Sequence, residues 1–150
     1  MNSGTLPAGF KLPSSQLSTA CAACIAGPEF LSHSIVAALD AKDHEHSSLT
    51  HIASNLRFTH DNIEATGREA LFEVLADIPG EQRFHVTRST SQVCQATGQA
   101  KIWLSVEVRG CPSTGRGVRE SVVLLHWRIV RGEWTCHLCR GLQHGGAGDD

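Results

Sequence analysis

Residues 121–142 constrain the fold most, because they form two β-rich runs separated by a short turn. The runs 121–130 and 134–142 flank Arg131-Gly132-Glu133, which is typical of a β-hairpin. Both runs carry apolar residues at odd and at even positions, so each predicted strand has two apolar faces. Such a strand is covered on both sides. We therefore expect helices or a ligand on one face of the sheet, and a second subunit or more chain on the other.

The rest of the chain shows helical spacing first and strand spacing afterwards. Helices are predicted over 28–42, 44–53 and 67–75, a brief strand over 56–60, and longer strands over 84–94 and 100–109. Helices followed by an antiparallel meander predict an α+β fold. We expect a cone, with the N-terminal helices packed on the concave face of a curved antiparallel sheet. The open end of such a cone is a natural pocket.

Composition limits the classes of partner. The 150 residues carry a net charge of −2 with no basic stripe, which argues against nucleic-acid binding. No apolar run approaches the ~20 residues of a membrane helix, and no signal-like N-terminus is present, so we expect a cytoplasmic protein without a membrane partner. Residues 1–27 are expected to form a flexible arm, 28–143 one domain, and 144–150 a disordered tail.

Three short segments in matching order, residues 40–43, 56–60 and 125–134, resemble scytalone dehydratase. Asp40-Ala-Lys-Asp43 is similar to its Asp-Ser-Lys-Asp, and Leu56-Arg-Phe-Thr-His60 is similar to its Leu-Arg-Ile-Asp-Tyr strand. Leu125-His-Trp127, followed by a turn and Trp134, resembles its Leu-His-Trp and following Trp. With the order of elements, this is similar to the SnoaL-like, nuclear-transport-factor-like cone fold over residues 28–143. That group includes polyketide cyclases, ketosteroid isomerase and scytalone dehydratase.

The resemblance implies a catalytic site at the mouth of the cone. His85 would be the catalytic histidine, Asp40 would orient it, and His60 would take the place of a tyrosine that holds water against the substrate carbonyl. A histidine held by a carboxylate suits the role of a base, and a second donor can stabilise an oxyanion. The chain has no tyrosine, and Leu124 stands where the family has an asparagine, so a substrate other than scytalone is expected.

The predicted function is cofactor-independent and metal-independent catalysis on a small apolar secondary-metabolite intermediate, by an isomerase, cyclase or dehydratase. Further residues are expected to contact the substrate: Phe30, Phe58, Val108, Leu124 and His126. Trp103 and Trp127 suggest a homodimer formed through the outer face of the sheet. The alternative is a non-catalytic ligand-binding or assembly module on the same fold. The alternative for each candidate is a residue without a catalytic role. Asp40 and His85 would then be exposed surface residues, and His60 and His126 would be hydrogen-bonded core histidines.

Two Cys-x-x-Cys pairs, Cys21/Cys24 and Cys136/Cys139, raise the alternative of a four-thiolate zinc site. Cys136 and Cys139 lie in a predicted strand, where positions three apart point to opposite faces. They are therefore expected not to bind one ion together, and to act as small apolar residues.

Overall fold

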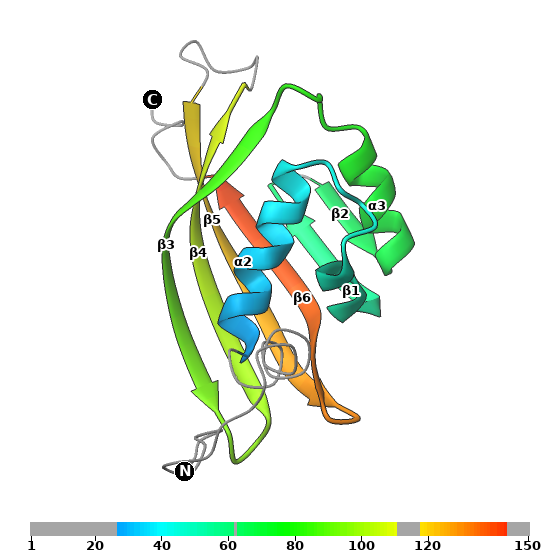
Figure 1. The fold of residues 1–150 in the computed structure, drawn as a ribbon, viewed down its shortest axis with the longest axis vertical. Coiled ribbons are helices and arrows are strands. Elements are labelled where there is room, and N and C mark those ends of the chain that lie inside the picture. Colours follow the sequence, from blue (N-terminus) through cyan, green and yellow to red (C-terminus); the bar gives the residue numbers. More distant parts are fainter. Residues whose placement is uncertain (1–26, 62, 111–117, 144–150) are drawn as a thin grey trace, which may run out of the picture.

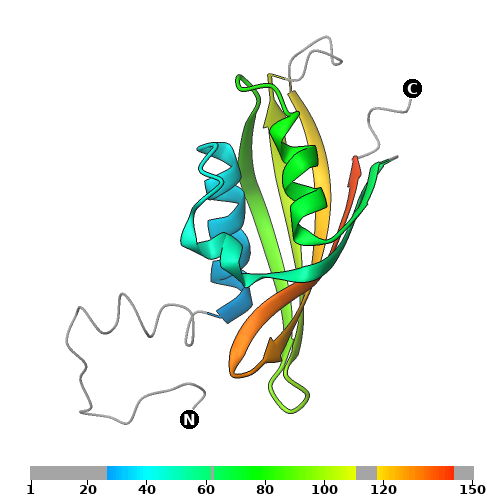
Figure 2. The ribbon, with the colours of Figure 1, turned by 90° about the vertical axis from the view of Figure 1, so that its right-hand side faces the viewer.

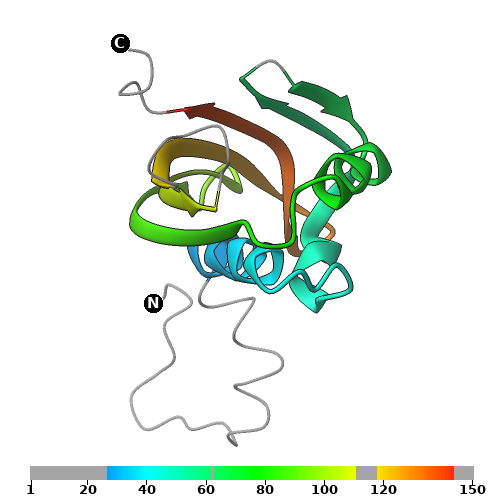
Figure 3. The same ribbon diagram turned by 90° about the horizontal axis from the view of Figure 1, so that it is seen from above.

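The fold is a curved sheet with helices on its inner face. A computed structural model describes residues 27–61, 63–110 and 118–143. Six strands form one sheet in the order β2-β1-β6-β5-β4-β3, and the sheet bends around the helices without closing (Figures 1 and 3). This confirms the predicted cone-shaped α+β class. The elements are α2 (Gly27–Asp40), the 3₁₀ turn η2 (Ser47–His51), β1 (Ile52–His60), β2 (Ile63–Thr66), α3 (Arg68–Ala76), β3 (Arg83–Cys94), β4 (Gln99–Arg109), β5 (Val118–Val130) and β6 (Glu133–Gln143).

The β5–β6 hairpin has the predicted turn. Arg131 and Gly132 have φ values of 55° and 82°, and the left-handed conformation at both central residues matches the twist of the flanking strands. The sheet as a whole is mixed and not purely antiparallel as predicted, because β1 pairs with β6 in parallel. This pairing brings two segments far apart in sequence side by side, between β2 and β5.

Two local predictions were wrong in the segment that leads to β1. The expected helix over 44–53 is the short turn η2, which His46 caps by accepting a hydrogen bond at Nδ1 from Ser48 N at 3.0 Å. The chain then extends at Ile52, so β1 begins earlier than expected. Strand β2 was not predicted, and it forms a hairpin with β1 after Asp61, whose φ is 54°.

The two helices cover different halves of the inner face. Helix α2 packs on β3 and β4, while α3 packs on β1 and β2 (Figure 2). Leu31, Ile35 and Ala38 are buried on one stripe of α2, at the spacing that keeps side chains on one helix face. Within the ranges described, no helix has the length and apolar content needed to cross a bilayer.

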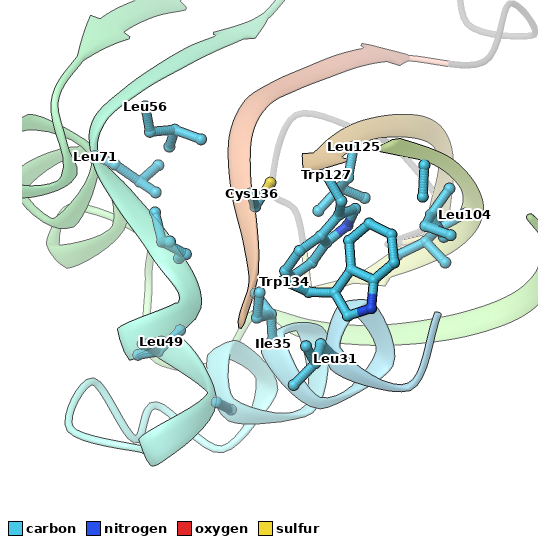
Figure 4. Packing of buried hydrophobic residues seen from close by; sticks show 14 of the residues in the cluster. Leu31, Ile35, Leu49, Leu56, Leu71, Leu104, Leu125, Trp127, Trp134 and Cys136 are labelled. Carbon is cyan, nitrogen blue, oxygen red and sulfur yellow. The ribbon is translucent and has the colours of Figure 1, made fainter. Parts of the chain in front are cut away.

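A buried hydrogen-bond chain ties α2 to the sheet. Trp127 Nε1 donates to Ser32 Oγ at 3.0 Å, and that hydroxyl donates to the carbonyl oxygen of Pro28 at 2.7 Å. Both Trp127 and Ser32 are almost fully buried. Large side chains from β5, β6 and α2 surround this chain and form the core shown in Figure 4, including Leu31, Ile35, Leu125, Trp127, Trp134 and Cys136.

Candidate functional site

The inner face of β5 and β6 changes in character along the strands. Near the β5–β6 turn it carries Trp127 and Trp134, which fill the space beneath α2. Toward the end of β6 it carries small residues instead, because Val123 pairs with Gly141 and Leu125 pairs with Cys139. We call the following residues the inner-face patch: Phe58, His60, Ser121, Val123, Cys139 and Gly141.

The patch is apolar and only partly covered. Phe58, Val123 and Cys139 pack against the core, yet they remain half-buried. Phe84 and Val86, on the inner face of β3, are half-buried as well. Ligand sites are mostly apolar with a few polar groups, so the polar members of the patch decide what it can do.

His60 is the last residue of β1, and it shares the inner face with Leu56 and Phe58. It pairs with Gly141 of β6, and its imidazole lies directly over the glycine backbone. A β-carbon at position 141 would overlap His60 Cδ2. The glycine therefore makes room for the imidazole, which remains 24% exposed.

Asp61 orients this histidine. Its backbone N–H donates to the carbonyl oxygen of Gly141 at 3.3 Å, and its left-handed φ of 54° begins the turn to β2. The carboxylate oxygen Oδ2 lies 3.2 Å from His60 Nδ1. A carboxylate at that distance favours a proton on Nδ1, which leaves Nε2 as the proton acceptor. The only signal for this contact in the sequence is the adjacency of His60 and Asp61.

Ser121 is the second polar group of the patch. It is 2% exposed, and its hydroxyl has no hydrogen-bond partner among the described residues. It lies on the inner face of β5, paired with Val106 and two residues before Val123. A buried hydroxyl without a partner costs about 1–3 kcal/mol, so such a group requires an explanation.

The two described cysteines of the second Cys-x-x-Cys pair lie on the same face, contrary to prediction. A β-bulge at His137 shifts the register, so Cys136 pairs with Trp127 and Cys139 with Leu125, both inward. Burial raises the pKa of both thiols, that of Cys139 to about 12, so both are neutral near pH 7. Metal ligands are thiolates. Over the described ranges, no group of three or more His, Cys, Asp or Glu could hold a metal ion, and Cys21 and Cys24 lie outside those ranges.

The structure does not bring Asp40 and His85 together. Asp40 Oδ1 accepts hydrogen bonds from Arg83 Nε and Phe84 N, both at 2.8 Å, and Oδ2 accepts from Arg83 at 2.8 Å. His85 is exposed and pairs with Glu107 on the outer face, because its neighbours Phe84 and Val86 take the inner face. The expected pair of Asp40 with His85 does not form. Asp40 instead forms an ion pair with Arg83, which joins the end of α2 to β3.

The five expected substrate contacts are divided between the two faces. Phe58 and Val108 lie on the inner face, where Val108 is 4% exposed. Leu124 and His126 lie on the outer face, because Ile102 pairs with Leu125 and turns the even-numbered residues outward. Phe30 is 47% exposed on α2.

Replacing Asp40 with asparagine tests the ion pair. Hydrogen bonds from Arg83, and also from Phe84 N, hold the pKa of Asp40 down at about 2. A lowered pKa in the folded state stabilises the fold above the ordinary aspartate pKa, and this contribution is lost as the pH falls toward 2. We expect Asp40→Asn to lower the free energy of unfolding by about 1–2 kcal/mol at pH 7. In urea denaturation this difference should shrink at pH 2.5, with the exposed Asp77→Asn as control; a difference independent of pH would contradict it.

Comparison with solved structures identifies the architecture. An NTF2-like protein with a cystatin-like fold from Novosphingobium aromaticivorans superposes with a TM-score of 0.65 at 14% identity, covering 80% of this chain and 81% of that one. The chain has the NTF2-like, cystatin-like fold. A provisionally named scytalone dehydratase from the same organism gives a TM-score of 0.60 at 15% identity, covering 75% of this chain and 78% of its own.

A provisionally named ketosteroid isomerase from Kribbella flavida has a TM-score of 0.54 at 17% identity and covers 77% of this chain and 76% of its own. The sequence matches no protein-family model and no curated protein. Identities this low establish the shared NTF2-like fold, while the function has to be argued from the site itself.

Proposed function

We propose that this NTF2-like chain is a cofactor-independent isomerase, cyclase or dehydratase that acts on a small, largely apolar carbonyl compound of secondary metabolism. The observation that supports this most is the pairing of His60 with Asp61 on an apolar face that also holds the Ser121 hydroxyl, which has no partner among the described residues. A base, its orienting carboxylate and a hydrogen-bond donor are the groups that enolisation requires. The solved relatives named as a dehydratase and an isomerase agree with this reaction class.

The proposed chemistry starts with proton transfer from carbon. His60 Nε2 takes a proton from the carbon next to the substrate carbonyl, and the C–H electron pair moves toward the carbonyl oxygen. The Ser121 hydroxyl donates a hydrogen bond to that oxygen as its negative charge develops. Return of the proton from the imidazolium to another carbon gives isomerisation. Its transfer to a β-hydroxyl that leaves as water gives dehydration. Attack of the enolate carbon on a second carbonyl, whose oxygen takes the proton, gives cyclisation. The apolar surroundings strengthen the hydrogen bond to the oxyanion.

Hydrogen exchange at carbon tests the proposal without knowledge of the substrate. A panel of cyclic and aromatic ketones is incubated with the protein in D₂O, and loss of the α-proton signal is followed by proton NMR. We expect at least one ketone to exchange faster than in buffer, and we expect Gly141→Ala to remove most of this acceleration. The added methyl group would displace the His60 imidazole, whose side chain moves more easily than the backbone.

The matched control is Gly80→Ala, because a β-carbon there meets nothing within 4 Å. Circular dichroism should show both variants folded. Acceleration that survives Gly141→Ala unchanged would remove His60 from the mechanism, and absence of any acceleration across the panel would favour the alternative of a non-catalytic binding module.

We also propose that two copies pair through the outer face of the sheet. Trp103 pairs with Leu124 in register, and both are half-buried and point outward. Val122 and Leu138 extend this apolar surface on β5 and β6. Sedimentation equilibrium should give a dimer for the wild type and a monomer for Trp103→Glu; a wild-type monomer would contradict the pairing.

A further inference from the structure

A pocket lies on the outer face, far along the strands from the inner-face patch. A pocket of about 360 Å³ opens there, beside the β3–β4 turn. Its polar lining includes Gln92, Cys94, Lys101, His126, Arg128 and His137. This volume is at the lower end of the range for small-ligand sites, which is about 300–1,000 Å³.

The pairing of the strands gathers positive and hydrogen-bonding groups in this pocket. Lys101 pairs with His126, and Gln99 pairs with Arg128, so cationic side chains from β4 and β5 lie next to one another. The bulge at His137 places its ring edge-to-face with His126, with ring centroids 6.2 Å apart. Three elements thus bring two imidazoles and two permanent cations to one concave surface.

Carboxylates are absent from the described lining of the pocket. On the same outer face, Glu107 and Glu120 pair with each other at the opposite end of β4 and β5. Glu133, two residues before Thr135 on β6, does not line the pocket either. The positive charge is therefore not neutralised by acidic side chains of the lining itself.

The histidines respond to this environment. Burial lowers the pKa of His126, and Lys101 and Arg140 lower it further. Burial also lowers the pKa of His137, with added effects of Arg128 and His126. Burial first, and the neighbouring cations second, thus disfavour the protonated form of both imidazoles, and a bound anion would oppose that effect.

We propose that this outer-face pocket binds the phosphate group of a small metabolite. The lining offers ammonium, guanidinium, imidazole and amide donors, which together can satisfy the several acceptor oxygens of a phosphate. A single carboxylate has fewer acceptor sites and a lower charge. The proposal is independent of the proposed catalytic function, because it involves none of the residues of the inner-face patch.

Titration calorimetry with inorganic phosphate tests the site on the full chain at pH 6.5, with glycerol phosphate and acetate as further probes. We expect saturable binding of both phosphates and at least tenfold weaker binding of acetate. Lys101→Gln should weaken phosphate binding at least tenfold, whereas Arg57→Gln, which removes an exposed charge on β1, should leave it unchanged. Equal losses in both variants would indicate non-specific charge attraction and would overturn the proposal.

Cys94 supplies a second measurement that does not depend on folding of a variant. Hydrogen bonds from Thr97 lower the pKa of this exposed thiol, so it should react readily with iodoacetamide. Phosphate should slow its alkylation, measured on the Cys94 peptide by mass spectrometry, and should raise the NMR-derived pKa of His126 and His137. Unchanged rates and pKa values would overturn the proposal. The proposal would also be overturned if Glu107 and Glu120 of a second copy fill the pocket. In that case Lys101→Gln would dissociate the dimer, and phosphate would not bind.

Discussion

Replacing His60 with glutamine should lower turnover at least about a hundredfold while the chain stays folded. Glutamine keeps a polar side chain of similar length over Gly141 but cannot accept the substrate proton near neutral pH. The measurement is the rate of α-proton exchange, on the ketone that the wild type exchanges fastest. His60 is half-buried, and Asp61 is its side-chain polar partner among the described residues, so we expect the fold to tolerate the change.

His44→Gln is the matched control, because His44 is exposed in the segment between α2 and η2. It should exchange the ketone at the wild-type rate. Equal rates in His60→Gln and wild type would show that the proton is taken by another group. Ser121→Ala should retain part of the activity, since it removes a hydrogen-bond donor and leaves the base in place.

Replacing Trp127 with alanine should have the largest effect on stability, about 3–5 kcal/mol. Trp127 is 1% exposed, and its indole fills the space between α2 and the sheet (Figure 4). Because small domains are stable by only about 5–15 kcal/mol, we expect a measurable fraction of the variant molecules to be unfolded at 37 °C. Urea denaturation at 25 °C measures the loss.

The hydrogen bond of Trp127 can be separated from its bulk. Ser32→Ala keeps the indole but removes the acceptor of its N–H, and we expect it to cost about 1–3 kcal/mol. Val130→Ala is the control, because Val130 is 42% exposed at the end of β5. If Trp127→Ala costs no more than Val130→Ala, α2 is not held to the sheet by this residue.

The sequence predicted the elements that have a regular period. Strand β4 alternates strictly between the buried Ile102 and Leu104 and the outward Trp103, and the β5–β6 turn contains Gly132. The segments that failed lack such a period: η2 is five residues long and β2 is four. β2 forms by pairing with β1, and η2 packs on α2, so neither conformation is contained in a local pattern.

The direction in which each side chain of β5 points was harder to predict than the strand itself, because both faces of β5 are apolar. Only the pairing of Ile102 with Leu125 decides that His126 points outward. The bulge at His137 is likewise a property of the β5–β6 pairing, and it reverses the expected orientation of Cys139 relative to Cys136. One shift in register moves every later side chain to the other face.

The candidate site could be predicted only in part from the sequence. The alternation of β1 placed His60 on the face of Phe58, as the structure has it. Asp61 was missed as its partner because the contact depends on a left-handed φ after β1. Ser121 was missed because the sequence alone does not show which groups surround a hydroxyl. Asp40 was expected to bind a histidine, yet Arg83 lies closer along β3 and forms two charged hydrogen bonds with it.

Binding of 2-naphthol, followed by NMR on isotopically labelled protein, tests the central claim most directly. Its ring is apolar and planar, and its ionised oxygen resembles the enolate oxygen of the proposed intermediate. The account predicts saturable chemical-shift changes at Phe58, His60, Ser121, Val123 and Gly141, and their loss in Gly141→Ala. Saturable changes confined to the outer face, around Trp103 and Leu124, or no binding at millimolar concentration, would contradict it.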